Sequence, residues 1–592
     1  MSFEQDYSAA RADEPRDCDW LVRTLPLFEG LEQPLLTALL EEFDWLAIQG
    51  GTILFEAGDA ADALYCVISG SLGAFASTPG KSGQVGTRHL VGRIAAGELV
   101  GEMSLISGKP RSATVIALRD SELGRLSRAA FERVMRQHPE GLLRVAQLLV
   151  QRLESSQSQA RSQRSMPRTF AIVPHDGGDS GTVFAAKLVT FLDRIGSTEL
   201  VWNHRGAQRT TEWFHAVERA NEFVVYVCES TATSWSKLCL RQADVILLLA
   251  DAESHLADWP ALQGYLDRNV TGQRPELVLL HKGSPTPGFT QRWLDLKPGL
   301  SHHHIRGPAD IDRLARSLTG TGLGVVLSGG GARGFAHIGV LRAFREAGIA
   351  IDAIGGTSLG SIVAAGYALE WSQEELQERV RRSFVATNPL NDYTLPLVSL
   401  VSGRKVSRLL HDEFGDVAIE DLPLPYFCVS TNLSTGHLAV HRRGPLWRWL
   451  RASVSIPGVL PPVIDGGEVF VDGAAINNLP VDVMRESGIG RVIGVDVAAD
   501  RVFTTDCEDS DVPPLWRAMK WFRDRKQRIN ILQILWRSGM VNSTANTVSR
   551  RELSDLLLQP PLEQIDMLDW QAFERAIEAG YRYAQVRLRD WQ

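Results

Sequence analysis

Two glycine-rich turns carry the residues of this sequence that could do chemistry. They are GGGARG at 329–334 and GTSLG at 356–360. The second turn has the GxSxG spacing that exposes a nucleophilic serine, here Ser358, between a strand and a helix. The same stretch also fits GxGxxG followed by an acid, Asp352, which is typical of a dinucleotide-binding turn. The glycines could therefore surround either an oxyanion or a phosphate.

The position of Asp352 favours the nucleophile. A dinucleotide-binding turn needs its acid at the C-terminal end of the second strand, where the carboxylate can reach a ribose. In IAIDAIGGTS, Asp352 stands near the start of the expected strand, and Ser358 follows its end. Gly356 and Gly360 leave room on both sides of Ser358 for a strained turn. The helix that follows would place its positive N-terminal dipole beside a developing negative charge.

The first glycine turn ends the neighbouring expected strand and also leads into a helix. Its backbone N–H groups could donate to an ester carbonyl oxygen as that oxygen becomes an oxyanion, and losing one such donor costs roughly 3–4 kcal/mol. We therefore predict an oxyanion hole from Gly329, Gly330, Gly331, Ala332, Arg333 and Gly334. The Arg333 side chain could fix this loop, form an ion pair in the turn or attract a headgroup phosphate. His337, one turn into the helix, is expected to pack in the core.

The serine needs a base, and two arrangements are open. No histidine follows His441, so a Ser–acid–His triad would need an acid between Ser358 and His437 or His441. Three residues could supply it: Asp392, Asp412 and Asp416. The better candidate is Asp472 in VFVDGAAINNLP at 469–480, between an apolar strand and small residues. If Asp472 is buried, its pKa would rise toward the range in which a carboxylate accepts a serine proton near pH 7.

The order GGGARG, GTSLG, DGA resembles the patatin-like phospholipases, which use a Ser–Asp dyad without histidine. The resemblance covers about residues 322–500 and includes ASVSIPGVLPPV at 452–463. It implies that Ser358 is the nucleophile and Asp472 the base, with no metal or cofactor in catalysis. With the N-terminal segment described next, the chain looks like the neuropathy target esterase branch, whose members hydrolyse phospholipids and lysophospholipids.

A second ligand-binding pattern is GEMSLISGKPRSATV, upstream of the glycine turns. Arg111 could neutralise a cyclic phosphodiester, Glu102 could accept from a ribose hydroxyl, and Ser112 could donate to a phosphate oxygen. Together with Gly101 they resemble the phosphate-binding cassette of cyclic nucleotide-binding domains, and the resemblance covers about residues 21–150. It implies that cAMP or cGMP is an effector of the enzyme.

The elements that position these groups fall into a multidomain chain. Short alternating segments with glycine turns predict a small N-terminal β-rich domain closed by a helix, and the resemblance to cyclic nucleotide-binding domains implies that it is a β-roll or jelly-roll. Strands alternating with helices predict a middle Rossmann-like α/β domain and a second α/β unit from residue 322, which the resemblance implies is a C-terminal patatin-like α/β hydrolase domain. The expected boundaries are an N-terminal tail at 1–20, the cyclic nucleotide-binding domain at 21–154, a linker at 155–168, the Rossmann-like domain at 169–320, the catalytic domain at 321–500 and its C-terminal helical extension at 501–592.

Composition narrows the functional classes. A net charge of −8 over 592 residues argues against a nucleic-acid partner, and six scattered cysteines argue against a disulfide frame or a zinc site. The stretch IVPHDGGDSGT lacks the GK[ST] of a phosphate-binding P-loop, so the middle domain is expected to have no nucleotide chemistry. The run His302, His303 and His304 has no second ligand cluster, so no metal site is expected.

Membrane contact is expected only from the surface. No apolar run approaches the ~20 residues of a membrane span. The sequence therefore predicts a cytoplasmic protein that meets the cytosolic face of the membrane peripherally. The basic, tryptophan-rich segment 513–540 could lie in the headgroup region, or it could form a helix that packs against the hydrolase core or a partner.

The sequence thus predicts a serine hydrolase that cleaves fatty-acyl esters of phospholipids or lysophospholipids and is regulated by a cyclic nucleotide. The alternative is a catalytically silent cyclic-nucleotide or lipid sensor, against which the intact Ser358 and Asp472 argue. The place of Asp352 argues against a dinucleotide-dependent enzyme.

Overall fold

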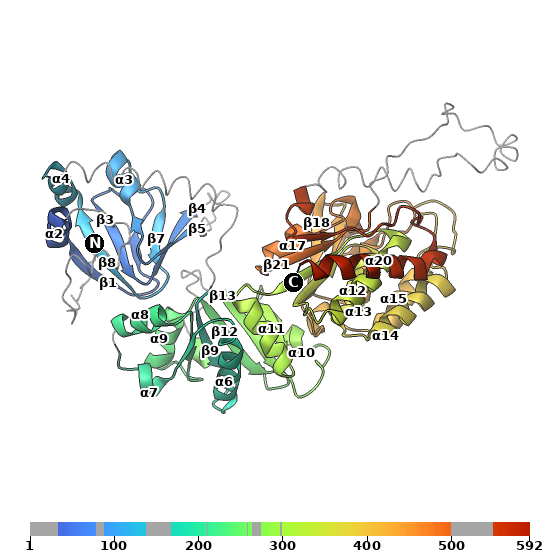
Figure 1. Cartoon of the computed structure of the whole chain (residues 1–592), viewed down its shortest axis with the longest axis horizontal. Coiled ribbons are helices and arrows are strands. Elements are labelled where there is room, and N and C mark those ends of the chain that lie inside the picture. Colours follow the sequence, from blue (N-terminus) through green and yellow to red (C-terminus); the bar gives the residue numbers. More distant parts are fainter. Residues whose placement is uncertain are drawn as a thin grey trace, which may run out of the picture. The chain divides into compact units, whose positions relative to one another are not determined.

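The chain forms two compact units in this computed structural model (Figure 1). The first unit comprises residues 1–280 and 299–303, and the second comprises 281–298 and 304–592. The structure describes residues 33–77, 88–137, 167–209, 211–256, 259–262, 274–296, 299–498 and 549–591.

The N-terminal domain is built from two four-stranded sheets, with strand orders β1-β8-β3-β6 and β2-β7-β4-β5. The strands are β1 (Asp44–Ile48), β2 (Ile53–Phe55), β3 (Ala63–Ser69), β4 (Ser71–Ser77), β5 (Arg88–Ala95), β6 (Leu99–Val100), β7 (Thr114–Ala117) and β8 (Ser121–Ser127), and the helices are α2 (Gln33–Glu42), α3 (Glu102–Ser107) and α4 (Arg128–Gln137). Strand β3 is buried along its whole length. The predicted β-roll is confirmed.

The middle domain is a six-stranded sheet with the order β10-β11-β9-β12-β13-β14. Its strands are β9 (Thr169–Pro174), β10 (Thr198–Val201), β11 (Phe223–Val227), β12 (Val245–Asp251), β13 (Arg274–Leu280) and β14 (Ser301–Ile305). Its helical segments are α6 (Ser180–Leu192), α7 (Asn203–Gly206), α8 (Thr211–Ala220), α9 (Ser234–Gln242) and the 3₁₀ turn η2 (Pro260–Leu262). Helices α10 (Phe289–Leu296) and α11 (Pro308–Leu318) belong to the second unit. The pairs β10–β11, β11–β9, β9–β12 and β12–β13 are parallel, as the alternation of strands and helices predicts. In chain order the sheet runs 2-3-1-4-5-6, whereas the Rossmann order is 3-2-1-4-5-6.

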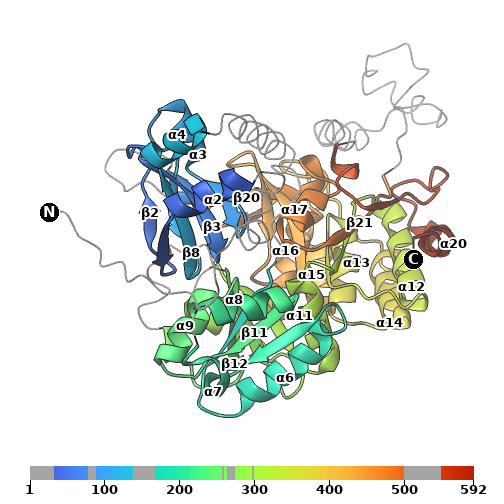
Figure 2. The same ribbon diagram turned by 60° about the vertical axis from the view of Figure 1, so that its left-hand side comes forward.

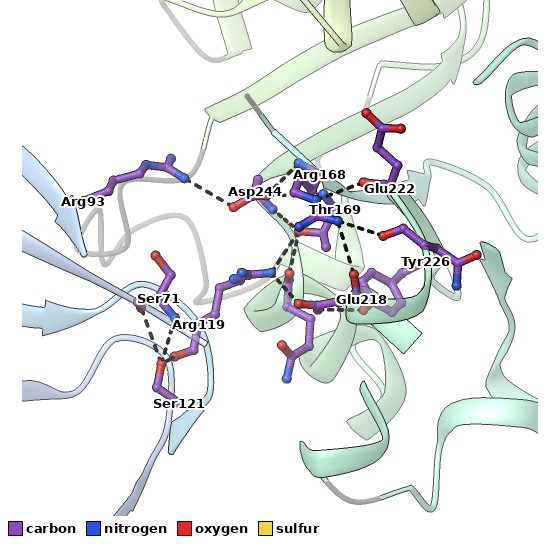
Figure 3. A network of polar contacts seen from close by, with 12 residues as sticks. Ser71, Arg93, Arg119, Ser121, Arg168, Thr169, Glu218, Glu222, Tyr226 and Asp244 are labelled. Atoms are coloured by element: carbon purple, nitrogen blue, oxygen red, sulfur yellow. Dashed lines mark hydrogen bonds and ion pairs between the residues drawn. The ribbon is translucent and has the colours of Figure 1, made fainter. Parts of the chain in front are cut away.

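Within the first unit, the β-roll and the middle sheet share a polar network (Figure 3). Arg119 Nη1 donates to Glu218 Oε2 at 3.0 Å, and the Tyr226 hydroxyl donates to Glu218 Oε1 at 3.1 Å. Arg93 Nη1 lies 3.3 Å from Asp244 Oδ1. The side chains of Arg119 and Glu218 are only 15% and 14% exposed, so water screens their attraction less than that of a surface pair. The network ties the two domains together through charges.

The catalytic domain is built on an eight-stranded sheet in the order β19-β20-β17-β16-β15-β21-β22, with β18 paired to β17. The strands are β15 (Leu323–Leu327), β16 (Ala353–Gly356), β17 (Tyr426–Asn432), β18 (His437–His441), β19 (Val463–Asp465), β20 (Glu468–Asp472), β21 (Arg491–Val495) and β22 (Leu556–Leu558). The helices are α12 (Ala336–Glu346), α13 (Leu359–Ala368), α14 (Gln373–Val380), the π-helical turn η5 (Arg381–Ala386), α15 (Arg404–Phe414), α16 (Leu446–Ser453), α17 (Val481–Glu486) and α20 (Phe573–Arg589). Four 3₁₀ turns are η4 (Gly331–Phe335), η6 (Ile419–Asp421), η7 (Gly473–Ala475) and η9 (Trp570–Ala572). Strands β16, β15, β21 and β22 run parallel, whereas β20 is antiparallel to β17.

The C-terminal extension contributes to the catalytic core. Strand β22 joins the sheet beside β21, which the prediction of a helical extension did not include. Helices α12 and α20 lie side by side in both views (Figure 2). Glycines allow this approach: a Cβ at Gly339 would lie 1.9 Å from Ile577 O, and one at Gly580 would lie 2.1 Å from Ala336 O. The segment 513–540 lies outside the described residues.

Candidate active site

Ser358 sits on a strained turn between β16 and α13. It is the N-cap of α13, with φ 52° and ψ −128°, a combination that side chains other than that of glycine rarely adopt. Gly356 and Gly360 are required by close approach, because Cβ atoms there would lie 2.6 Å from Leu327 O and 2.4 Å from Ser328 O. The turn thus has the geometry that GxSxG predicts.

Asp472 ends β20 as a buried carboxyl, 1% exposed. Its Oδ1 accepts the Ala474 N–H at 2.9 Å, while its Oδ2 has no hydrogen-bond partner among the described residues. Burial raises the pKa of Asp472 to about 7, although the Ala474 N–H and the nearby Ser358 hydroxyl oppose this rise. The Ser358 hydroxyl is thus close enough to favour the carboxylate, but it makes no hydrogen bond to Oδ2 in this geometry. Such contacts often tighten only when substrate binds.

The end of α16 and the turn after it bridge the two residues. Ser453 Oγ accepts the Ser358 N–H at 3.0 Å, and the Ser455 carbonyl accepts the Asp472 N–H at 2.9 Å. Asp472 also pairs in register with Ser430 on β17. Sequence reasoning included this turn in the block ASVSIPGVLPPV but assigned neither serine a role. The small polar residues two apart in that block are the signal that could have identified them.

The glycine loop after β15 lies directly against Ser358. A Cβ on Gly329 would lie 3.0 Å from Ser358 Cβ and 2.7 Å from Asn478 Oδ1. The Gly329 N–H donates to Asn478 O at 3.3 Å, and Asn478 Nδ2 donates back to Gly329 O at 3.2 Å. The Ala332 N–H donates to Met567 O at 2.8 Å. Between them, the N–H groups of Gly330 and Gly331 have no acceptor among the described residues. Asn478 therefore orients this loop, a role that sequence reasoning missed.

The rest of the predicted oxyanion segment supports the turn. Arg333 is buried, and its Nε donates to Ile565 O at 2.7 Å, which fixes the loop to the C-terminal segment. Gly334 packs so close to α13 that a Cβ would lie 2.9 Å from Leu359 Cδ2. His337 Nε2 bonds Ser328 O at 2.8 Å, and burial lowers the pKa of His337 to about 4, so its ring stays neutral.

The structure does not assemble the alternative histidine triad. His441 Nε2 bonds Ser430 Oγ at 2.6 Å, its ring stacks on Trp449, and burial lowers its pKa to about 4. His437 is exposed. Of the three candidate acids, Asp392 accepts from Ser402 Oγ at 2.6 Å, and Asp412 and Asp416 are exposed.

A largely apolar pocket opens beside the nucleophile. It encloses about 800 Å³, including open solvent, and Ser358 and Gly331 form part of its wall. Most of the wall comes from α13, α14, η5, α15, η9 and the turn after α16, through side chains such as Ile362, Phe384, Leu410, Ile456, Leu460 and Trp570. A pocket with this lining suits an extended hydrocarbon chain.

The structure also gathers the four residues of the predicted nucleotide site. Gly101, with φ 85°, precedes buried Glu102 at the start of α3, and Ser112 is exposed. Arg111 is 3% exposed, and its Nη1 and Nη2 donate to Gly101 O at 2.9 Å and Ala63 O at 2.6 Å. Its Nε has no hydrogen-bond partner among the described residues.

Three other sequence features have structural contacts. Asp352 forms an ion pair with Arg316 at 2.7 Å and accepts the Leu323 N–H at 2.9 Å. These contacts fix the start of strand β15. His303 Nε2 contacts Glu276 at 2.7 Å, and His304 Nε2 contacts Glu420 O at 2.8 Å. The part of the chain that the structure describes contains no group of His, Cys, Asp and Glu able to hold a metal.

Family comparisons identify the domain that holds Ser358 and Asp472. Residues 325–485 match the model of the patatin-like phospholipase family. These residues form a patatin-like phospholipase domain. Residues 167–321 match the P-loop-like domain of the neuropathy target esterase family, and residues 46–138 match the cyclic nucleotide-binding domain. The resemblance to patatin-like phospholipases of the neuropathy target esterase branch is therefore confirmed.

Three similar proteins align with nearly the whole of this chain. The chain is 31% identical to human patatin-like phospholipase domain-containing protein 6, over 93% of this chain and 44% of that protein. It is 30% identical to the neuropathy target esterase sws of Drosophila melanogaster, over 93% and 43%. It is 28% identical to lysophospholipase NTE1 of Saccharomyces cerevisiae, over 95% and 42%. The chain thus spans less than half the length of these relatives.

Among solved structures, the catabolite activator protein of Thermus thermophilus is 27% identical, over 29% of this chain and 70% of that one, with a TM-score of 0.21. Among the described residues of all three domains, no helix is long and apolar enough to cross a bilayer.

Proposed function

We propose that this protein is a serine hydrolase that releases fatty acid from phospholipids or lysophospholipids through a Ser358–Asp472 dyad. The observation that carries the proposal is the buried Asp472 carboxyl, which has a pKa of about 7 and an unpaired Oδ2 beside the strained Ser358. A carboxyl with that pKa is about half in its basic form at neutral pH, so it can accept the serine proton. The names of the relatives support an acyl ester of a phospholipid or lysophospholipid as the substrate.

In the first half-reaction, Ser358 Oγ attacks the acyl carbonyl carbon while its proton passes to Asp472 Oδ2. The carbonyl oxygen becomes an oxyanion, which accepts from the free N–H groups of Gly330 and Gly331. Collapse of this intermediate breaks the acyl C–O bond, and Asp472 returns the proton to the departing glycerol oxygen. The acyl group, now an ester of Ser358, occupies the apolar pocket.

In the second half-reaction, water attacks the acyl-enzyme and gives one proton to Asp472. The same N–H groups hold the second oxyanion. Its collapse breaks the bond to Ser358 Oγ, which takes the proton back from Asp472, and the fatty acid leaves. This chemistry uses only protein groups and water. A silent sensor would gain nothing from a buried carboxyl with an unpaired Oδ2 beside a strained serine, because both features destabilise the fold.

Product analysis tests this reaction. Full-length protein is expected to convert lysophosphatidylcholine to fatty acid and glycerophosphocholine. In water enriched in ¹⁸O, the label should enter the fatty acid and not the glycerophosphocholine, because water attacks the acyl carbon. Mass spectrometry of both products makes the measurement. Release of phosphocholine or choline, or label in glycerophosphocholine, would contradict acyl-ester cleavage.

We also propose that the N-terminal domain binds cAMP or cGMP, with Arg111 on the phosphate and Glu102 on the ribose. Burial of both charged side chains beside the start of α3 supports this assignment. An effector can alter activity only if it binds two states of the protein with different affinity. Arg119 and Arg93 contact the middle domain at Glu218 and Asp244, so a movement of the β-roll would change these polar contacts (Figure 3).

Replacing Arg111 with methionine is expected to weaken nucleotide binding roughly 10- to 100-fold, because a hydrogen bond to a charged group contributes about 1.5–3 kcal/mol. Isothermal titration with cAMP and with cGMP measures the change. The matched control is Lys109→Met, which removes an exposed cation two residues away and should leave affinity within twofold. Equal losses in the two variants would indicate only general electrostatic attraction.

A further inference from the structure

An apolar loop projects from the catalytic domain between η5 and α15. Its tip, residues 393–398, reads YTLPLV, and every residue in it is exposed. The side chains of Tyr393, Leu395, Leu397 and Val398 are 78%, 73%, 83% and 68% exposed, more than any other large apolar side chain of the described residues. Single exposed apolar residues are ordinary, but a contiguous group of this kind marks a surface that meets another apolar phase. We call residues 393–398 the apolar tip.

The apolar tip stands on a fixed base. Below it, Tyr393 and Val401 form an antiparallel bridge, and the Thr394 N–H donates to Leu400 O at 3.1 Å. One step further down, the Ser402 N–H donates to Asp392 O at 2.8 Å. These bonds hold both strands of the loop together, so the exposure of its tip is imposed by the fold.

The base of the loop is bonded to a segment that contributes to the pocket wall. The N–H groups of Leu400 and Val401 donate to the carbonyls of Gly458 and Val459 at 2.9 and 3.0 Å. The pocket beside Ser358 is lined by residues on both sides of that contact and on both flanks of the loop: Ile456, Leu460, Pro389, Leu390, Val406 and Leu409. The loop that carries the apolar tip is therefore flanked on both sides by residues that line the pocket.

Charge around the loop suits an anionic lipid surface. No acidic residue occurs between Asp392 and Asp412, whereas Arg404, Lys405 and Arg408 do. The Asp392 carboxylate is engaged by Ser402 Oγ at 2.6 Å. Arg404 and Arg408 are exposed near the base. An apolar tip above a cationic base is typical of an element that enters the headgroup region of a membrane.

We propose that residues 393–398 insert into the surface of an anionic phospholipid bilayer and set the acyl pocket against the lipid. This inference rests on the proposed function, because it gives the hydrolase a route to substrate in a bilayer. The segment 513–540 is not needed for it. A second copy of the chain could also cover an apolar loop, but neither the cations nor the adjacent pocket wall would then have a purpose.

The test uses the full-length double variant Leu395→Ser/Leu397→Ser. The matched control is Ile464→Ser, since Ile464 on β19 is also an exposed apolar side chain, at 62%. Sedimentation with phosphatidylcholine–phosphatidylglycerol vesicles, in a Ser358→Ala background, measures binding without hydrolysis. We expect the double variant to bind roughly 10-fold more weakly or worse, and the control to bind like the parent.

Hydrolysis is measured separately, with Ser358 intact. The double variant should hydrolyse a dissolved short-chain ester at the parent rate and vesicle phospholipid several-fold more slowly. Vesicle binding equal to that of the control would overturn the proposal, and so would a parent dimer that the double variant alone converts to monomers. If the parent binds vesicles through the apolar tip but hydrolyses neither ester, the proposed function fails while the membrane contact stands.

Discussion

Replacing Asp472 with asparagine is expected to lower kcat for ester hydrolysis by about 10²- to 10⁴-fold, the contribution of a well-placed general base. Asparagine has the same shape and can still accept the Ala474 N–H through its carbonyl oxygen. It cannot take up the serine proton. Initial rates on a dissolved short-chain ester measure the loss without any contribution from membrane binding.

The same substitution should stabilise the protein at alkaline pH. Burial raises the folded-state pKa of Asp472 to about 7 from an unfolded value near 3.8. The folded state therefore holds a proton that the unfolded state releases between these values, and stability present below pH 4 is lost as pH rises to about 7. Between pH 5 and pH 8 this loss is on the order of 2–3 kcal/mol, which Asp472→Asn avoids. Thermal unfolding followed by calorimetry at the two pH values measures it.

Asp465→Asn is the matched control for both effects. Asp465 lies on the neighbouring strand β19, where its side chain is 44% exposed and paired with Arg448. Its loss should change the rate by less than twofold and the stability by under about 1 kcal/mol. A stability gain in Asp472→Asn that is the same at pH 5 and pH 8 would mean that the carboxyl titrates normally and cannot serve as the base proposed here.

Features set by a few consecutive residues could be predicted from the sequence. The turn at Ser358 is one, because the glycines on both sides are the only residues that fit beneath Leu327 and Ser328. The β-roll and the alternating strands and helices are others, because apolar periodicity and glycine turns encode them locally. Asp472 could be singled out because small residues follow an apolar strand there.

Features set by residues distant in the sequence could not be predicted from it. Ser453, Asn478 and Met567 hold the active-site backbone from three separate segments, and nothing local in the sequence marks which donor each of them meets. Strand β22 is too short, at three residues, to stand out in an apolar pattern. The order of the middle sheet depends on which strands pair, which alternation alone does not specify. The orientation of Arg333 toward Ile565 likewise follows from the C-terminal extension.

Ser358→Ala and Ser358→Gly are both expected to lower kcat for hydrolysis by about 10⁴- to 10⁶-fold, because neither retains the nucleophilic Oγ. Their stabilities should differ. At φ 52° and ψ −128° a side chain strains the backbone by about 1–3 kcal/mol, and glycine relieves that strain. Glycine also increases the conformational entropy of the unfolded chain, which lowers the stability of the folded state by roughly 0.5–1 kcal/mol. The net expectation is that Ser358→Gly is more stable than Ser358→Ala by about 1 kcal/mol. Calorimetric unfolding of the two variants makes the comparison.

The matched comparison is the same pair of substitutions at Ser407, inside helix α15. At that position the alanine variant should be more stable than the glycine variant by about 1 kcal/mol, because glycine destabilises a helix interior. In each pair the hydroxyl is lost from both members, so the difference reports the backbone alone. Opposite signs at positions 358 and 407 are expected, whereas a glycine penalty at both would show that the turn stores no strain. Strain that Ser358→Ala keeps and Ser358→Gly relieves would mean that the fold gives up stability to hold this serine against the Asp472 carboxyl and the N–H groups of Gly330 and Gly331.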